Sequence, residues 1–219
     1  MSRDQSHAKV SYDWFGSWTT LYNLYADAQL CFHLDGTDLS PDTSSVYERQ
    51  RQDLLIDTPS KKQPGFVPRH IYQKQSLWYH YVRQKYGLPL DSRHLYTKTD
   101  WEFFAMAVAR QDVRSEILES VATWINETVT DRPFTDLHNT EGNGEFPGPN
   151  FFARPVIGGH FAFLALERAC GGRAMEGLSF LNENPAEAKE WAATAAKAAA
   201  ELTSTSKYRF GHGSTDEEL

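Results

Sequence analysis

Apolar residues recur at helical spacing in five segments of the chain. The first runs from Trp14 to Leu34, where large apolar side chains return every three or four positions, as on one face of an amphipathic helix. The same spacing predicts four more helices, over residues 69–86, 99–110, 112–127 and 155–170. Gly87 follows the second helix and Gly171 the last, as glycines often do where helices end. Since no segment shows a strong strand pattern, the sequence predicts an all-α fold built from helical hairpins.

The remaining segments are polar or rich in small residues. Residues 35–64 are dominated by Asp, Ser, Thr, Arg and Gln, which predicts a flexible insertion with a weak helix over 46–55. In "NPAEAKEWAATAAKAAAELT", Asn184 is the expected cap of an Ala-rich helix and Pro185 its first residue, and the thin apolar face favours a surface position. The expected parts are an N-terminal extension 1–11, a helical domain 12–180 that contains the insertion 35–64, an Ala-rich helix 181–203 and a disordered tail 204–219.

The composition narrows the classes of function. The net charge is −7 and no long basic run occurs, which disfavours binding to nucleic acid. No apolar run approaches the roughly 20 residues that cross a bilayer, and the first residues lack the apolar core of a secretory signal. Motifs for a metal, a phosphate loop or a catalytic serine or cysteine are missing, so we expect neither a metal nor a cofactor.

The two cysteines allow one internal disulfide without requiring it. Cys31 lies on the apolar face of the first predicted helix, which favours a buried and unreactive thiol over a reactive one, and whether it pairs with Cys170 stays open. The tripeptide Asn-Glu-Thr at Asn126 is an acceptor pattern for a glycan, but such tripeptides also occur by chance.

Three polar residues precede the predicted helix at Thr99. Neither helical periodicity nor capping requires Asp91, Arg93 or His94 at these positions. An arginine can hold a carboxylate through two parallel hydrogen bonds, and a histidine can transfer protons near neutral pH. The alternative is an ordinary loop in which His94 is solvated.

The helix start itself carries two acids. Thr99 followed by Glu102 matches a capping box, which gives Glu102 a structural explanation. Asp100, in the first turn, favours the helix dipole but also fits a helix N-terminus that opens on a cleft. For Asp100 the two interpretations stay open.

Two further loops carry candidate residues. Asp136 lies in "DRPFTDLHNTEG", part of a long irregular stretch of a kind that is often functional, although a turn residue is the alternative. Arg154 directly precedes Pro155, so its backbone is expected to be extended and its side chain to project over the end of a helical bundle. Gly158 and Gly159 follow, and they favour close approach of another helix.

Four blocks together, "WTTLYNLYAD", "YGLPLDSRHLYTKTDWEFF", "WINETVTDRPFTDLHNTEG" and "FFARPVIGGHFAFLAL", resemble the C-terminal catalytic region of the fungal glutaminase A family. The resemblance implies an (α/α) toroid of six helical hairpins and an extracellular enzyme that hydrolyses L-glutamine to L-glutamate and ammonia. Members of this family are longer and begin with a signal peptide and a β-rich region. We therefore expect an incomplete toroid, whose exposed helix faces would favour self-association and whose activity alone is in doubt.

The resemblance also implies a mechanism on a small amide substrate. Asp100 or Asp136 would activate water, the other acid would protonate the leaving ammonia, and Arg93 or Arg154 would hold the substrate carboxylate. Of the other polar members of the matching blocks, His94 is a further catalytic candidate and Asp91 a further substrate-binding candidate. Two alternatives remain: glycoside hydrolysis, which also uses two carboxylates, and a non-catalytic fragment or interaction module.

Overall fold

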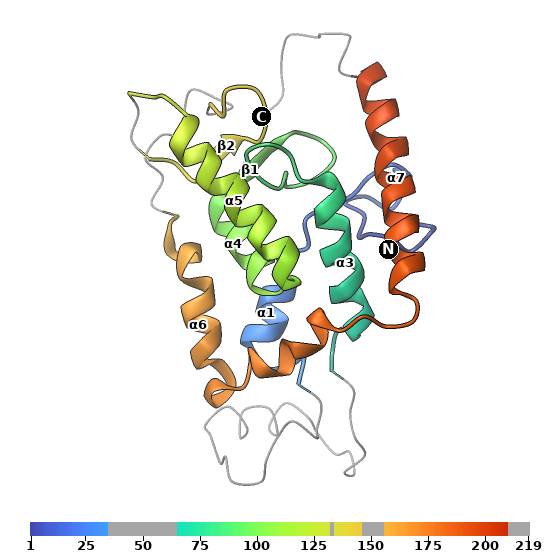
Figure 1. The fold of residues 1–219 in the computed structure, drawn as a ribbon, viewed down its shortest axis with the longest axis vertical. Coiled ribbons are helices and arrows are strands. Elements are labelled where there is room, and N and C mark those ends of the chain that lie inside the picture. The colour runs from blue at the N-terminus through green and yellow to red at the C-terminus, as the bar shows by residue number, and fades with distance from the viewer. Residues whose placement is uncertain (35–64, 132–133, 146–155, 210–219) are drawn as a thin grey trace.

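A computed structural model describes residues 1–34, 65–131, 134–145 and 156–209, and Figure 1 shows its fold. The α-helices are α1 (Leu24–Gln29), α3 (Arg69–Val82), α4 (Thr99–Ala107), α5 (Gln111–Glu127), α6 (Ala162–Arg168) and α7 (Ala188–Arg209). Three 3₁₀ helices are η1 (Gly158–Phe161), η2 (Ala169–Gly172) and η3 (Glu176–Asn182). Within the described ranges the only sheet pairs β1 (Tyr96–Lys98) with β2 (Leu137–Asn139). The predicted all-α class is confirmed.

Buried apolar residues form two cores with α4 between them. The first core is centred on Trp78 and joins α3, α5 and α7. The second lies around Tyr72 and Leu166 and joins α1, α6 and the 3₁₀ segments that follow. Phe103 of α4 and Phe163 of α6 pack against both. None of the helices in the described part of the chain is long and apolar enough to span a membrane.

The first predicted helix is wrong over most of its length. Only Leu24–Gln29 is helical. The amide of Thr19 donates to the carbonyl of Ala8 at 3.1 Å, and that of Thr20 to the carbonyl of Leu90 at 2.8 Å. These amides bond to distant segments instead of to the carbonyl four residues earlier, which an α-helix requires. The apolar spacing in this region therefore comes from a loop packed into the core.

The boundaries of other helices also differ from the predicted ones. Helix α3 ends at Val82, so Gly87 does not close it, and Gly87 instead adopts a φ of 143° beside the Glu102 carboxylate. The predicted helix over 155–170 is divided into η1, α6 and the start of η2, while Pro155 and the expected weak helix at 46–55 lie outside the described residues.

The Ala-rich helix α7 lies along α3 (Figure 1). It begins at Ala188 rather than Pro185, and Asn184 is no cap, because its side-chain oxygen accepts a hydrogen bond from Arg110 at 3.2 Å. Three small residues of α7 are buried against the first core: Ala195, Ala198 and Ala199. Because small side chains let two helix backbones approach closely, α7 is part of the core, and it continues to Arg209.

The structure answers the open question of whether the two cysteines pair, and Cys31 is not the buried thiol expected by default. Cys31 lies just beyond α1 with a φ of 67°, and it forms a disulfide with Cys170 in η2, 139 residues away. This bond joins the loop after α1 to the segment after α6, so it fixes the second core covalently.

Candidate functional site

The short sheet brings two loops together at the N-terminus of α4. Lys98, the last residue of β1, lies opposite Leu137, the first residue of β2. The amide of Thr99 donates to the carbonyl of Asp136 at 2.9 Å. Since Asp100 occupies the first turn of α4 and Asp136 directly precedes β2, the two acids converge on one junction from distant parts of the sequence.

Both acids are buried, with 7% of Asp100 and none of Asp136 exposed. Burial raises the pKa of Asp100, and the negative charge of Asp136 raises it further, while Lys98 opposes both effects. The ammonium of Lys98 lies 3.8 Å from Oδ2 of Asp136 and 4.7 Å from the ring centre of Trp101. The site therefore contains one carboxyl group whose pKa is raised and a second carboxyl group beside a cation.

The backbone of η1 forms one wall of this site. A Cβ atom placed on Gly159 would come within 2.6 Å of Cβ of Asp100, so only glycine fits here without a shift. The predicted close approach of another segment is confirmed at Gly159, but nothing lies within 4 Å of the same position on Gly158. On the aromatic side, Tyr22 stacks on Trp101 with ring centres 3.8 Å apart.

Glu102 does not act as a capping residue, so that prediction is wrong. No side chain caps α4. The Glu102 carboxyl is buried under the 87–88 loop, where Oε1 accepts a hydrogen bond from the amide of Leu88 at 2.6 Å. Burial raises its pKa well above the ordinary value, and the charge of Asp100 adds to this effect. Glu102 is therefore a third buried acid close to Asp100.

Asp91, Arg93 and His94 precede β1, whereas Asp100 follows it. Nε and Nη2 of Arg93 donate to the two carboxylate oxygens of Asp91 at 2.9 and 2.7 Å. The fork that could hold a substrate carboxylate is thus occupied by Asp91, while His94 is exposed and stacks on Tyr96. The structure does not place these three residues in contact with Asp100 or Asp136, and Arg154 lies outside the described residues.

His138, in β2 close to Asp136, is a structural residue. It is fully buried, its ring stacks on Trp124 with centres 3.7 Å apart, and Nε2 lies 2.9 Å from the carbonyl of Tyr86. Burial lowers the pKa of His138 to about 4, so the ring is neutral near pH 7.

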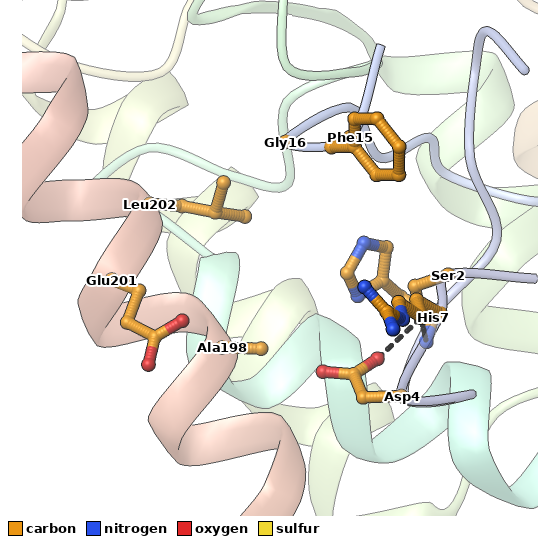
Figure 2. A pocket seen from close by; sticks show the side chains of 9 residues that line it. Ser2, Asp4, His7, Phe15, Gly16, Ala198, Glu201 and Leu202 are labelled. Atoms are coloured by element: carbon orange, nitrogen blue, oxygen red, sulfur yellow. Dashed lines mark hydrogen bonds between the residues drawn. The ribbon is translucent and has the colours of Figure 1, made fainter. Parts of the chain in front are cut away.

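Two cavities lie elsewhere in the described part of the molecule. One, of about 570 Å³, separates the N-terminal segment from α7, and Figure 2 shows the side chains of Asp4 and His7 facing Glu201 and Leu202 across it. Asp4 is held there by hydrogen bonds from Ser2 and Ser6. The other, of about 740 Å³, lies between α3, α5 and the start of α7. Neither is lined by any predicted site residue.

Sequence reasoning missed Lys98 and the inward position of Glu102. Lys98 ends a strand of three residues, which is too short to produce a recognisable alternation. The signal for Glu102 was Gly87, because a positive-φ glycine next to a buried side chain marks a close approach.

Known proteins resemble this chain over most of its length. Residues 60–164 match the family described as the glutaminase A six helical-hairpin domain. A protein named probable glutaminase in Arthroderma benhamiae is 64% identical over 182 residues, which are 83% of this chain and 20% of that protein. Glutaminase A of Aspergillus oryzae is 41% identical over 165 residues, 74% of this chain and 22% of that protein. No solved structure matches the chain.

The fold and these matches define an all-α protein of the six-helical-hairpin class. More particularly, residues 60–164 match part of a glutaminase A six helical-hairpin domain, which confirms the resemblance seen in the sequence. It spans about a fifth of the length of the curated relatives that it matches.

Proposed function

We propose that this chain hydrolyses the side-chain amide of L-glutamine to L-glutamate and ammonia, with Asp136 as the general base and Asp100 as the general acid. The observation that carries the proposal is the convergence of these two buried acids at one helix start, in a chain whose relatives are named glutaminases. The raised pKa of Asp100 supports its role as the acid, because a carboxyl group with a raised pKa keeps its proton to higher pH and can donate it.

The reaction needs one proton to be removed from water and one to be donated to the leaving nitrogen. Ionised Asp136 removes a proton from water as the water oxygen bonds to the amide carbon, and the carbonyl oxygen becomes an oxyanion. Protonated Asp100 then donates its proton to the amide nitrogen as the C–N bond breaks and ammonia leaves. The new carboxylic acid returns a proton to Asp100, and Asp136 gives its proton to ammonia. Glutamate and ammonium leave, and both side chains regain their starting states.

A second reaction class deserves a direct comparison in the same assay. Two carboxylates beside the stacked rings of Tyr22 and Trp101 also fit glycoside hydrolysis, in which aromatic side chains support the sugar. Glutamine, asparagine and a set of aryl glycosides should therefore be tested together, and release of ammonia from glutamine with no glycoside cleavage is the expected result.

The decisive variants are Asp100→Asn and Asp136→Asn, assayed for ammonia release from glutamine. Each should lose about 10²- to 10⁴-fold in kcat, the usual contribution of a positioned acid or base. Asp112→Asn is the matched control, because Asp112 pairs with Arg110 with 60% of its side chain exposed, and it should keep full activity. Unchanged activity in both site variants, or a folded wild-type chain that releases no ammonia, would contradict the proposal.

A further inference from the structure

We propose that Lys98 is a positioning residue whose ammonium places a positive charge beside the Asp136 carboxyl group and so assigns the base role to Asp136 and the acid role to Asp100. This inference rests on the proposed function of the same site. It adds a residue that acts through Asp136 without taking part in proton transfer itself.

The position of the Lys98 ammonium is fixed by its surroundings. Nζ lies over the face of Trp101 at 4.7 Å from the ring centre, and the Trp101 ring is itself stacked on Tyr22. Cations are attracted to aromatic faces at such distances. Because the ring cannot turn away without losing its stack on Tyr22, the ammonium stays beside Asp136.

Burial makes this charge effective. Only 16% of the Lys98 side chain is exposed and none of Asp136. The attraction between opposite charges is weakly screened in such a setting, whereas water reduces it strongly at the surface. The separation of 3.8 Å between Nζ and Oδ2 is longer than a direct hydrogen bond, so Lys98 acts through its charge.

The charged groups around the pair come from four elements. Lys98 belongs to β1, Asp100 and Glu102 belong to α4, and Asp136 precedes β2. From η1, His160 faces the rings of Phe103 and Phe134, and the residue of η1 that touches Asp100 is the uncharged Gly159.

Without a nearby cation, neither of two interacting carboxyl groups would be the preferred site of the shared proton. Lys98 breaks this symmetry, because its ammonium pairs with Asp136 at 3.8 Å, whereas the Asp100 carboxyl forms no ion pair among the described residues and is affected by the Lys98 charge only from farther away. The ammonium therefore favours Asp136 as the base and leaves the acid role to Asp100.

The test is the pH dependence of kcat/KM in Lys98→Met and Lys98→Arg. Lys98→Met keeps most of the length of the side chain without its charge, so the profile should move to higher pH and kcat should fall about tenfold to a hundredfold. Lys98→Arg keeps the charge and should restore the wild-type profile. The control is Lys85→Met, which removes an exposed lysine that is also paired with a carboxylate and an aromatic ring, and should leave the profile unchanged.

A second measurement separates this inference from the proposed function. In protein labelled with ¹³C at the aspartate carboxyl carbons, the resonance of Asp100, identified by its loss in Asp100→Asn, should titrate at higher pH in Lys98→Met and not in Lys98→Arg, because the Lys98 charge lowers the pKa of Asp100. If the Asn variants are inactive but Lys98→Met moves neither the profile nor the resonance, Lys98 has no such role. If no ammonia is released, the proposed function fails, and the resonance still decides the effect of Lys98.

Discussion

Two lysines of this protein have the same kinds of partner but differ in their surroundings. Lys85 lies 4.3 Å from the ring centre of Tyr86 and 2.6 Å from Glu127, and 53% of its side chain is exposed. Lys98 lies 4.7 Å from the ring of Trp101 and 3.8 Å from Asp136, and 16% of its side chain is exposed. By distance alone the pair at Lys85 is the closer one. The comparison teaches that burial, as well as distance, decides how strongly water screens an ion pair.

The largest test of this comparison is to open the wall that buries the Lys98 pair. Segment η1 touches Asp100, and α6, which follows it, leads to the disulfide at Cys170. Replacing both cysteines, Cys31→Ser with Cys170→Ser, should lower the free energy of unfolding by about 2–5 kcal/mol, because the unfolded chain loses a long covalent loop. Urea unfolding measures this loss.

In the same double variant, the Lys98–Asp136 pair should be screened by water more like the exposed Lys85–Glu127 pair. If α6 loosens, water reaches the Lys98 pair, and Lys98→Met should then change the pH profile less than it does in the disulfide-bonded protein. Adding a thiol reductant to the double variant is the control and should have no effect. An unfolding midpoint equal to that of the wild type would show that the disulfide does not support this wall.

A smaller change should come from one methyl group at the wall. Gly159→Ala would place Cβ 2.6 Å from Cβ of Asp100 and 2.8 Å from its Cα, so we expect a loss of about 1–3 kcal/mol in unfolding free energy and reduced ammonia release. Gly158→Ala is the matched control, because nothing lies within 4 Å of its added Cβ. Equal stability of the two variants would argue against the close contact.

The smallest expected effect is on the pH dependence of stability. The pKa of Glu102 is raised in the folded chain above its ordinary value of 4.5, mainly by burial. Its contribution to stability is therefore complete below 4.5 and is lost as the pH rises through the folded value. Relative to wild type, Glu102→Gln should be more stable at pH 7 than at pH 4, as measured by urea unfolding at both values.

Glu127→Gln applies the same measurement of pH-dependent stability to an exposed carboxylate. Hydrogen bonding from Lys85 lowers the pKa of Glu127, so its contribution is present above 4.5 and is lost as the pH falls. The sign is opposite to that of Glu102, and because the group is exposed, solvent should make the effect hard to detect. A Glu102→Gln variant with the same pH dependence as wild type would mean that Glu102 is ionised in the folded protein.

Sequence reasoning succeeded where local pattern decides structure. The helix predicted over 112–127 is observed at Gln111–Glu127, and the one predicted from Thr99 begins there. It failed where long-range contacts decide. Trp18 has helical spacing to its neighbours, yet its buried position comes from a loop held by hydrogen bonds to distant segments. Glu102 matches a local capping pattern, yet its carboxylate accepts a hydrogen bond from the distant amide of Leu88 instead.

The candidate site shows the same division. Asp100 and Asp136 could be selected because they lie in loops or at a helix start where acids have chemical uses. Their convergence could not be predicted, because it depends on two strands of three residues each, which leave no periodic signal. Arg93 was selected for its chemistry, but its neighbour Asp91 occupies the same hydrogen-bonding groups.

Phe103 lies in α4, three residues after Asp100, and it packs against both cores of the molecule. A residue in this position ties the evolution of the two cores together. A change of side-chain volume in either core would shift the helix that carries Asp100, so the geometry of the candidate site depends on residues far from it. Among related sequences, the residues around Phe103 should therefore change in compensating groups rather than one at a time.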